Sequence, residues 1–130
     1  MLNDHTEYTT WLAIKKHHVD AGNVAEFLAW YIDNPSPVGG LFGRELTRAE
    51  VVRQAVEAAA AAFAGTKVEI RHTETPEFHA QVCFVLTGTL VGQAFVCAGN
   101  TSQLAVMIQN EHGAFVVIPS KNVIGMENAA

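Results

Sequence analysis

The sequence contains no apolar run that approaches the roughly 20 residues needed to cross a bilayer. Its first ten residues, MLNDHTEYTT, lack the basic, apolar and small-residue order of a secretory signal peptide. No block of Lys and Arg extends beyond Lys15-Lys16, and eight basic against thirteen acidic residues give a formal charge of -5. Because a phosphate backbone attracts positive charge, nucleic acid is a poorly matched partner. We therefore expect a cytoplasmic protein that binds neither a membrane nor nucleic acid.

Cysteine is also scarce, since the chain has only Cys83 and Cys97. The two lie 14 residues apart and only His79 is near either of them, whereas zinc sites usually use close ligand pairs. The adjacent His17 and His18 would point about 100 degrees apart on a helix. We expect no metal, no cofactor and two free, mostly buried thiols.

The composition that is present favours one ordinary folded domain. At 130 residues the chain has the length of a single domain, which we assign to residues 1–130. A hydrophobic content of 49% is enough to bury a core without a disulfide or a structural metal.

Three amphipathic segments in the first half predict helices. In the first, Tyr8, Trp11 and Val19 recur at helical spacing, and Lys15 interrupts this otherwise apolar face. The second covers about residues 24–32 and ends at an Asp-Asn-Pro break. The third covers residues 48–64, where a run of alanines gives a narrow packing surface. Three pairs have the spacing of helix N-caps: Asp4 with Glu7, Asn23 with Glu26 and Thr47 with Glu50.

The second half predicts strands. Residues 67–73 alternate between apolar and charged side chains. Residues 78–99 are rich in β-branched and aromatic side chains and are interrupted by Thr87-Gly88-Thr89, so we expect a long hairpin that turns there. A second hairpin is expected from residues 104–109 and 114–118, and residues 122–126 form a last short strand or a loose tail. The expected class is α+β, with three N-terminal helices packed on a curved antiparallel sheet.

The order of these elements resembles the nuclear-transport-factor-two-like superfamily, particularly its SnoaL-like polyketide cyclases and ketosteroid isomerases. The similar phrases are Val19-Asp20-Ala21-Gly22-Asn23-Val24, Tyr31-Ile32-Asp33-Asn34, Thr87-Gly88-Thr89 with Gly92, and Glu111-His112-Gly113. The resemblance implies a cone-shaped half-barrel with an apolar internal pocket and a homodimer formed through the outer sheet face. It also implies that the isomerase catalytic residues are not retained, because Lys15, Gly39 and Ala105 fall at or near their places.

The polar groups that could still face such a pocket are few. Lys15 and Asp33 are the catalytic candidates, because a lysine among apolar neighbours would lose its charge by desolvation unless a carboxylate compensated it. In the alternative, Lys15 extends to solvent and Asp33 only ends its helix. The expected ligand-binding residues are Trp11, Lys15, Tyr31, Asp33, Phe42, Ala80, Val82 and Phe84.

Three functional interpretations follow. The first is a protein that binds a small apolar molecule in an internal pocket, as an isomerase, cyclase or dehydratase would. The second is a non-catalytic module of the same fold that binds a ligand or a protein. The third takes residues 81–126 as an Sm-like small barrel behind a helical extension, which predicts a closed barrel, ring assembly and RNA binding. The acidic balance of the chain argues against RNA.

Overall fold

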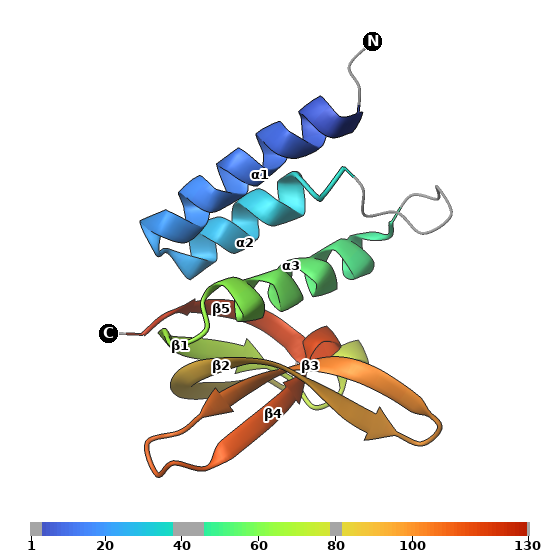
Figure 1. Ribbon diagram of the computed structural model, residues 1–130. Helices are drawn as coiled ribbons and strands as arrows, with labels where there is room; N and C mark the ends of the chain where they lie inside the picture. Colours follow the sequence, from blue (N-terminus) through green and yellow to red (C-terminus); the bar gives the residue numbers. More distant parts are fainter. Residues whose placement is uncertain (1–3, 38–45, 79–81, 130) are drawn as a thin grey trace.

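The computed structural model describes residues 4–37, 46–78 and 82–129, in which three helices precede a five-stranded antiparallel sheet (Figure 1). This arrangement confirms the predicted α+β class with three N-terminal helices on a curved antiparallel sheet. The helices are α1 (Asp4–Ala21), α2 (Val24–Asp33) and α3 (Arg48–Ala62), and the strands are β1 (Lys67–His72), β2 (Phe84–Ala98), β3 (Thr101–Gln109), β4 (Phe115–Pro119) and β5 (Val123–Asn128). Two short 3₁₀ turns, η2 (Pro76–Phe78) and η3 (Ser120–Asn122), lie between strands.

The strands follow the order β4-β3-β2-β1-β5 in the sheet. The last strand therefore returns to the first and pairs with β1, so the predicted segment 122–126 is a strand from residue 123 onward and not a loose tail, while Asn122 ends η3. The small-barrel interpretation predicted five strands within residues 81–126, but only β2 to β5 begin in this range and the fifth strand of the sheet, β1, precedes it. The sheet is also not closed, because β4 and β5 lie at its opposite edges.

The hairpin turn predicted at residues 87–89 is wrong. Strand β2 continues through this segment, and Thr87 and Thr89 pair with Glu69 and Lys67 of β1. The chain reverses later, at Gly99-Asn100, and β2 then pairs with β3. Gly88 has a different purpose, since a Cβ atom there would lie 2.6 Å from the backbone oxygen of Gln109. A glycine inside a strand often marks such a close approach of two backbones.

A β-bulge between Leu90 and Gly92 changes which side chains of β2 face the helices. Before the bulge, Leu90 faces inward and is fully buried. The extra residue reverses the alternation, so that odd-numbered residues face inward beyond it. Gln93 thus reaches α3, where its side-chain amide donates a hydrogen bond of 2.9 Å to the backbone oxygen of Glu57. Phe95 lies on the same side.

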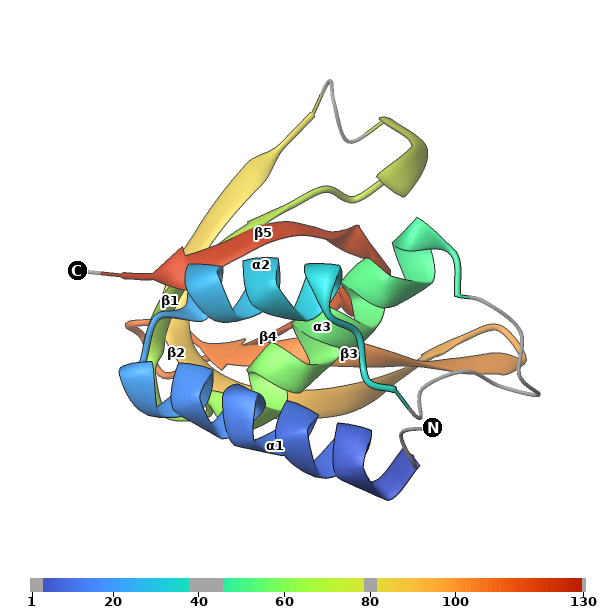
Figure 2. The same ribbon diagram turned by 90° about the horizontal axis from the view of Figure 1, so that it is seen from above.

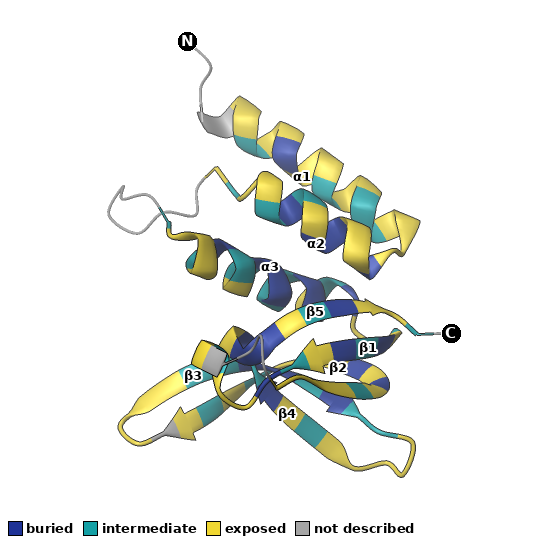
Figure 3. Ribbon diagram, turned by 180° about the vertical axis from the view of Figure 1, so that it is seen from behind, coloured by how far each residue is buried: buried dark blue, intermediate teal, exposed yellow. Residues whose placement is uncertain are grey.

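The core lies between α3 and the inner face of the sheet. Ala55 and Ala59 of α3 are completely buried, which confirms that the alanine run lets this helix sit close to the strands. Figure 3 shows the buried residues concentrated where α3 meets the sheet. Burying each large apolar side chain contributes about 1.5–3 kcal/mol. The fully buried apolar residues of the sheet are Val68, Ile70, Leu90, Ala105, Val106 and Ile108.

The other two helices lie outside α3 (Figure 2). Helix α2 contacts α3 and β5, and α1 rests mainly on α2. Two of the three predicted caps are confirmed, whereas Asp4 lies inside α1 as its first described residue. The Asn23 side chain accepts a hydrogen bond from the Glu26 amide at 3.0 Å, and Thr47 and Glu50 form a reciprocal capping box with two bonds of 3.2 Å. These caps fix where α2 and α3 begin.

The two cysteines are free, as predicted, but both are exposed, so the expected burial is wrong. Cys83 precedes β2, and Cys97 lies near the β2–β3 turn, which extends beyond the helices (Figure 1). Among the helices that the structure describes, none combines the length and the apolar character that crossing a membrane requires.

Candidate functional site

Three of the predicted ligand-binding residues lie together between α1 and α2. Trp11 is buried, and its indole N–H donates a 2.7 Å hydrogen bond to the backbone oxygen of Asn34. The ammonium nitrogen of Lys15 lies 5.6 Å from the centre of the Trp11 ring, and the Tyr31 ring meets Trp11 edge-on at 5.5 Å. Burial, followed by the charge of Glu57, raises the pKa of Tyr31, so its hydroxyl is protonated at neutral pH.

The remaining predicted residues lie elsewhere. Asp33 is exposed at the end of α2, and no ion pair between described residues joins it to Lys15. Val82, which precedes β2, and Phe84, its first residue, are exposed by 46% and 41%, and the Phe84 ring contacts His72. Phe42 and Ala80 lie outside the described residues. The hollow that Trp11 lines does not include Phe84.

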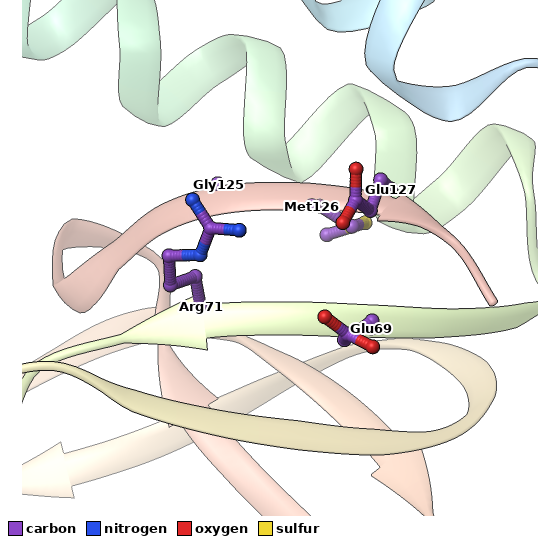
Figure 4. A pocket seen from close by; sticks show the side chains of 5 residues that line it. All are labelled: Glu69, Arg71, Gly125, Met126 and Glu127. Atoms are coloured by element: carbon purple, nitrogen blue, oxygen red, sulfur yellow. The ribbon is translucent and has the colours of Figure 1, made fainter.

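Two hollows are poor candidates for a binding site, because one has few charged lining residues and the other is small. One, of about 400 Å³, includes Trp11 and lies between α1 and the segment that follows α2; its only charged lining residue in the described part of the chain is Glu7. The other is a notch of about 150 Å³ on the outer face of β1 and β5 (Figure 4). The Glu69 and Glu127 side chains lie near each other there, and Arg71 lies farther along β1. A space this small holds a few water molecules rather than a ligand.

A larger hollow, of about 530 Å³, opens between the first two turns of α3, the β1–β2 connection and η3. We call it the first hollow. Part of its wall is apolar, through Val52, Pro76, Val123 and Ile124. Its other lining residues are Arg48, Ala49, Arg53, Thr73, Ser120, Lys121 and Asn122.

Buried polar side chains hold the wall of the first hollow in place. Thr73 and Ser120 are exposed by only 1% and 2%; the Ser120 hydroxyl donates to the Leu104 backbone oxygen at 3.1 Å, and the Thr73 amide donates to the Asn122 backbone oxygen at 3.0 Å. Asn122 is exposed by 9%, and its side-chain oxygen has no hydrogen-bond partner among the described residues. An unpaired buried acceptor is rare, because leaving one costs about 1–3 kcal/mol.

Three cations surround this space. Arg48, Arg53 and Lys121 line it, they are exposed, and no ion pair joins any of them to a described carboxylate. The N-terminus of α3 adds the positive end of a helix dipole on the same side. No Asp or Glu is among the described residues that line the hollow. Three of the eight basic residues of an acidic chain thus surround one cavity.

A second hollow, of about 340 Å³, adjoins the first and shares Arg53 and Lys121 with it. Glu57 is its only acidic lining residue in the described chain. Burial raises the pKa of the Glu57 carboxyl, while its contact with Ser120 and the charge of Arg53 lower it by smaller amounts. The hollow is completed by Phe95, Ser102, Gln103 and Leu104.

The residues that line the two hollows were not predicted from the sequence. Arg48 and Arg53 are ordinary surface positions of a helix, and Lys121 follows a proline in a turn. Phe95 reaches the helix side only because of the β-bulge. The one available signal was the scarcity of basic residues, which makes any cluster of three notable.

Comparison with protein-family models, with curated protein sequences and with solved structures yields no match. Within residues 4–37, 46–78 and 82–129, no group of three or more His, Cys, Asp or Glu side chains is arranged to hold a metal ion.

Proposed function

We propose that this protein binds a small molecule that combines an anionic group with an apolar part, and that the first hollow is its binding site. The proposal keeps the expectation that a small molecule binds, which the resemblance to the nuclear-transport-factor-two-like superfamily suggested. It moves the site from the concave face of the sheet, which α3 fills, to the space beside η3.

The observation that carries the proposal is the charge of the first hollow. Arg48, Arg53 and Lys121 meet there without a lining carboxylate among the described residues, in a chain with formal charge -5. A phosphate or carboxylate group would neutralise these cations, since Arg and Lys bind such groups through charge-assisted hydrogen bonds. The unpaired oxygen of Asn122 would accept a hydrogen bond from a hydroxyl or amine of the same ligand.

The lining supports binding rather than catalysis. An enzyme needs at least two titratable groups within reach of one ligand atom, in complementary acid and base roles. Among the described residues, the titratable side chains that line the first hollow are all basic. The volume of about 530 Å³ lies within the range of small-molecule sites, roughly 300–1,000 Å³.

The test measures binding of octyl phosphate by isothermal titration calorimetry, with octanol as the neutral comparison. The double variant Arg53→Gln/Lys121→Gln should lower the affinity for octyl phosphate by about tenfold, because each exposed charge contributes up to about 1 kcal/mol. The control Lys67→Gln/Arg71→Gln removes the same charge from the outer face of β1 and should bind normally. Equal binding of octanol, or equal losses in both double variants, would contradict the proposal.

The proposal also includes self-association. The outer face of β3 and β4 carries an apolar patch formed by Met107, Phe115 and Val117, of which Phe115 is exposed by 62%. Exposed apolar groups of this kind favour a protein contact over solvent. This supports a homodimer through the outer sheet face.

A further inference from the structure

The second hollow adjoins the first, since Arg53 and Lys121 line both spaces. A group held by these two cations would have open space on each side. On one side lies the apolar wall of Val52, Val123 and Ile124, and on the other side lies Phe95. The two hollows therefore adjoin at Arg53 and Lys121.

Phe95 is unusual in its surroundings. Its side chain is 74% exposed although it faces the helix side of the sheet, where it pairs with Leu104 across β2 and β3. An exposed phenyl ring next to two cations offers a flat surface on which a planar ring can stack while an attached anion meets the cations. The β-bulge in β2 creates this arrangement, because it turns Phe95 toward the hollow.

The polar groups of the second hollow define what the ring would carry. Glu57, Ser102 and Gln103 line it beside Phe95, and Glu57 is the only carboxyl there among the described residues. This carboxyl would repel a second anionic group of the ligand, whereas it would accept a hydrogen bond from an amino group on the ring. Burial raises the pKa of Glu57, which agrees with its position in a partly enclosed space.

We propose that the second hollow takes an aromatic ring, so that the preferred ligand is an aromatic phosphate whose anionic group lies on Arg53 and Lys121. This inference rests on the proposed function, which it deepens by naming the ligand class. A ring-bearing phosphate of this kind is either a simple aryl phosphate or a nucleotide. The amino group of adenine favours the nucleotide, because the Glu57 carboxyl can accept a hydrogen bond from it.

The test compares three probes by isothermal titration calorimetry: octyl phosphate, 2-naphthyl phosphate and adenosine 5′-monophosphate. The variant Phe95→Leu removes the ring from an exposed position, so the fold should be retained. Its matched control is Phe115→Leu, which makes the same change at an exposed residue of the opposite face. We expect Phe95→Leu to lower the affinity for at least one ring-bearing phosphate by about fivefold and to leave octyl phosphate unchanged, because aromatic pairs contribute about 0.5–1.5 kcal/mol.

The outcomes separate the two proposals. Loss with adenosine 5′-monophosphate assigns the site to nucleotides, and loss with 2-naphthyl phosphate alone assigns it to aryl phosphates. If octyl phosphate binds but Phe95→Leu affects neither ring-bearing probe, or if Phe115→Leu has the same effect, the inference is overturned and the proposed function stands. If octyl phosphate does not bind the wild-type protein, the proposed function fails first.

Discussion

At the scale of single residues, Gly88 shows how closely the backbone of β2 approaches its neighbour. It is buried on the inner face, opposite Val68, and a side chain there would meet backbone atoms of Gln109 and the end of the Ile108 side chain. Backbone atoms cannot move aside as the end of a flexible side chain can. The close approach of the chain at Gly88 to the backbone of Gln109 therefore depends on the absence of a Cβ atom.

The substitution Gly88→Ala should destabilise the protein by about 1–3 kcal/mol, the usual cost of forcing an extra methyl group into a packed site. Urea unfolding followed by tryptophan fluorescence measures this loss. Gly125→Ala is the matched control, because Gly125 also lies in a strand and a Cβ atom added there would have open space within 4 Å. Comparable stability of the two variants would show that Gly88 is not needed for the close approach.

The sequence could not have identified this constraint. Thr87-Gly88-Thr89 has the composition of a turn, and only the pairing partner, Gln109, explains why a glycine lies in the middle of a strand. The same limit applies to Phe95, whose direction depends on a one-residue bulge. By contrast, Thr47 and Glu50 were predictable, because a capping box depends on residues only three positions apart.

At the scale of elements, the pairing of β1 with β5 contains an electrostatic conflict. Glu69 lies directly opposite Glu127, and like charges in this position destabilise a sheet. Figure 4 shows both carboxylates on the outer face, with Arg71 farther along β1. This pairing joins the last strand to the first, so it holds η3, and with it Lys121, next to α3.

Replacing one of these carboxylates by a cation should strengthen the pairing. We expect Glu127→Lys to raise the free energy of unfolding by about 0.2–1 kcal/mol, because an opposite-charge pair replaces a like-charge pair. Thermal unfolding at low salt measures the gain, which should diminish as added salt screens the charges. Glu111→Lys makes the same change of charge at an exposed turn residue. If the free energy of unfolding rises equally in both variants, the change in total charge, and not the cross-strand pair, is responsible.

At the scale of the whole molecule, the helices occupy one side of the sheet and leave the other uncovered (Figures 1 and 3). The alternation in residues 67–73 made the inner face of β1 predictable, since Val68 and Ile70 are buried there. The candidate site was not predictable in the same way. It combines residues from α3, β2 and η3, and their proximity depends on the return of β5 to β1, which local patterns do not encode.

The uncovered side leads to a prediction about assembly. Phe115 and Val117 point away from the helices, because the alternate residues Val116 and Ile118 pack on the core side. Met107 lies opposite Val117 on the neighbouring strand, so the three side chains form one apolar patch. A second copy of this chain presents the same patch, and a two-fold contact would remove both patches from water.

We therefore expect light scattering to give twice the mass of a single chain for the wild-type protein. Phe115→Lys should shift the particle to the mass of one chain, because it would place two like charges at the two-fold contact. Ile14→Lys is the control, since it introduces the same charge at an exposed apolar residue of α1, away from the sheet. A single-chain mass for the wild-type protein, or a dimer that persists in Phe115→Lys, would mean that the outer sheet face is not the contact between subunits.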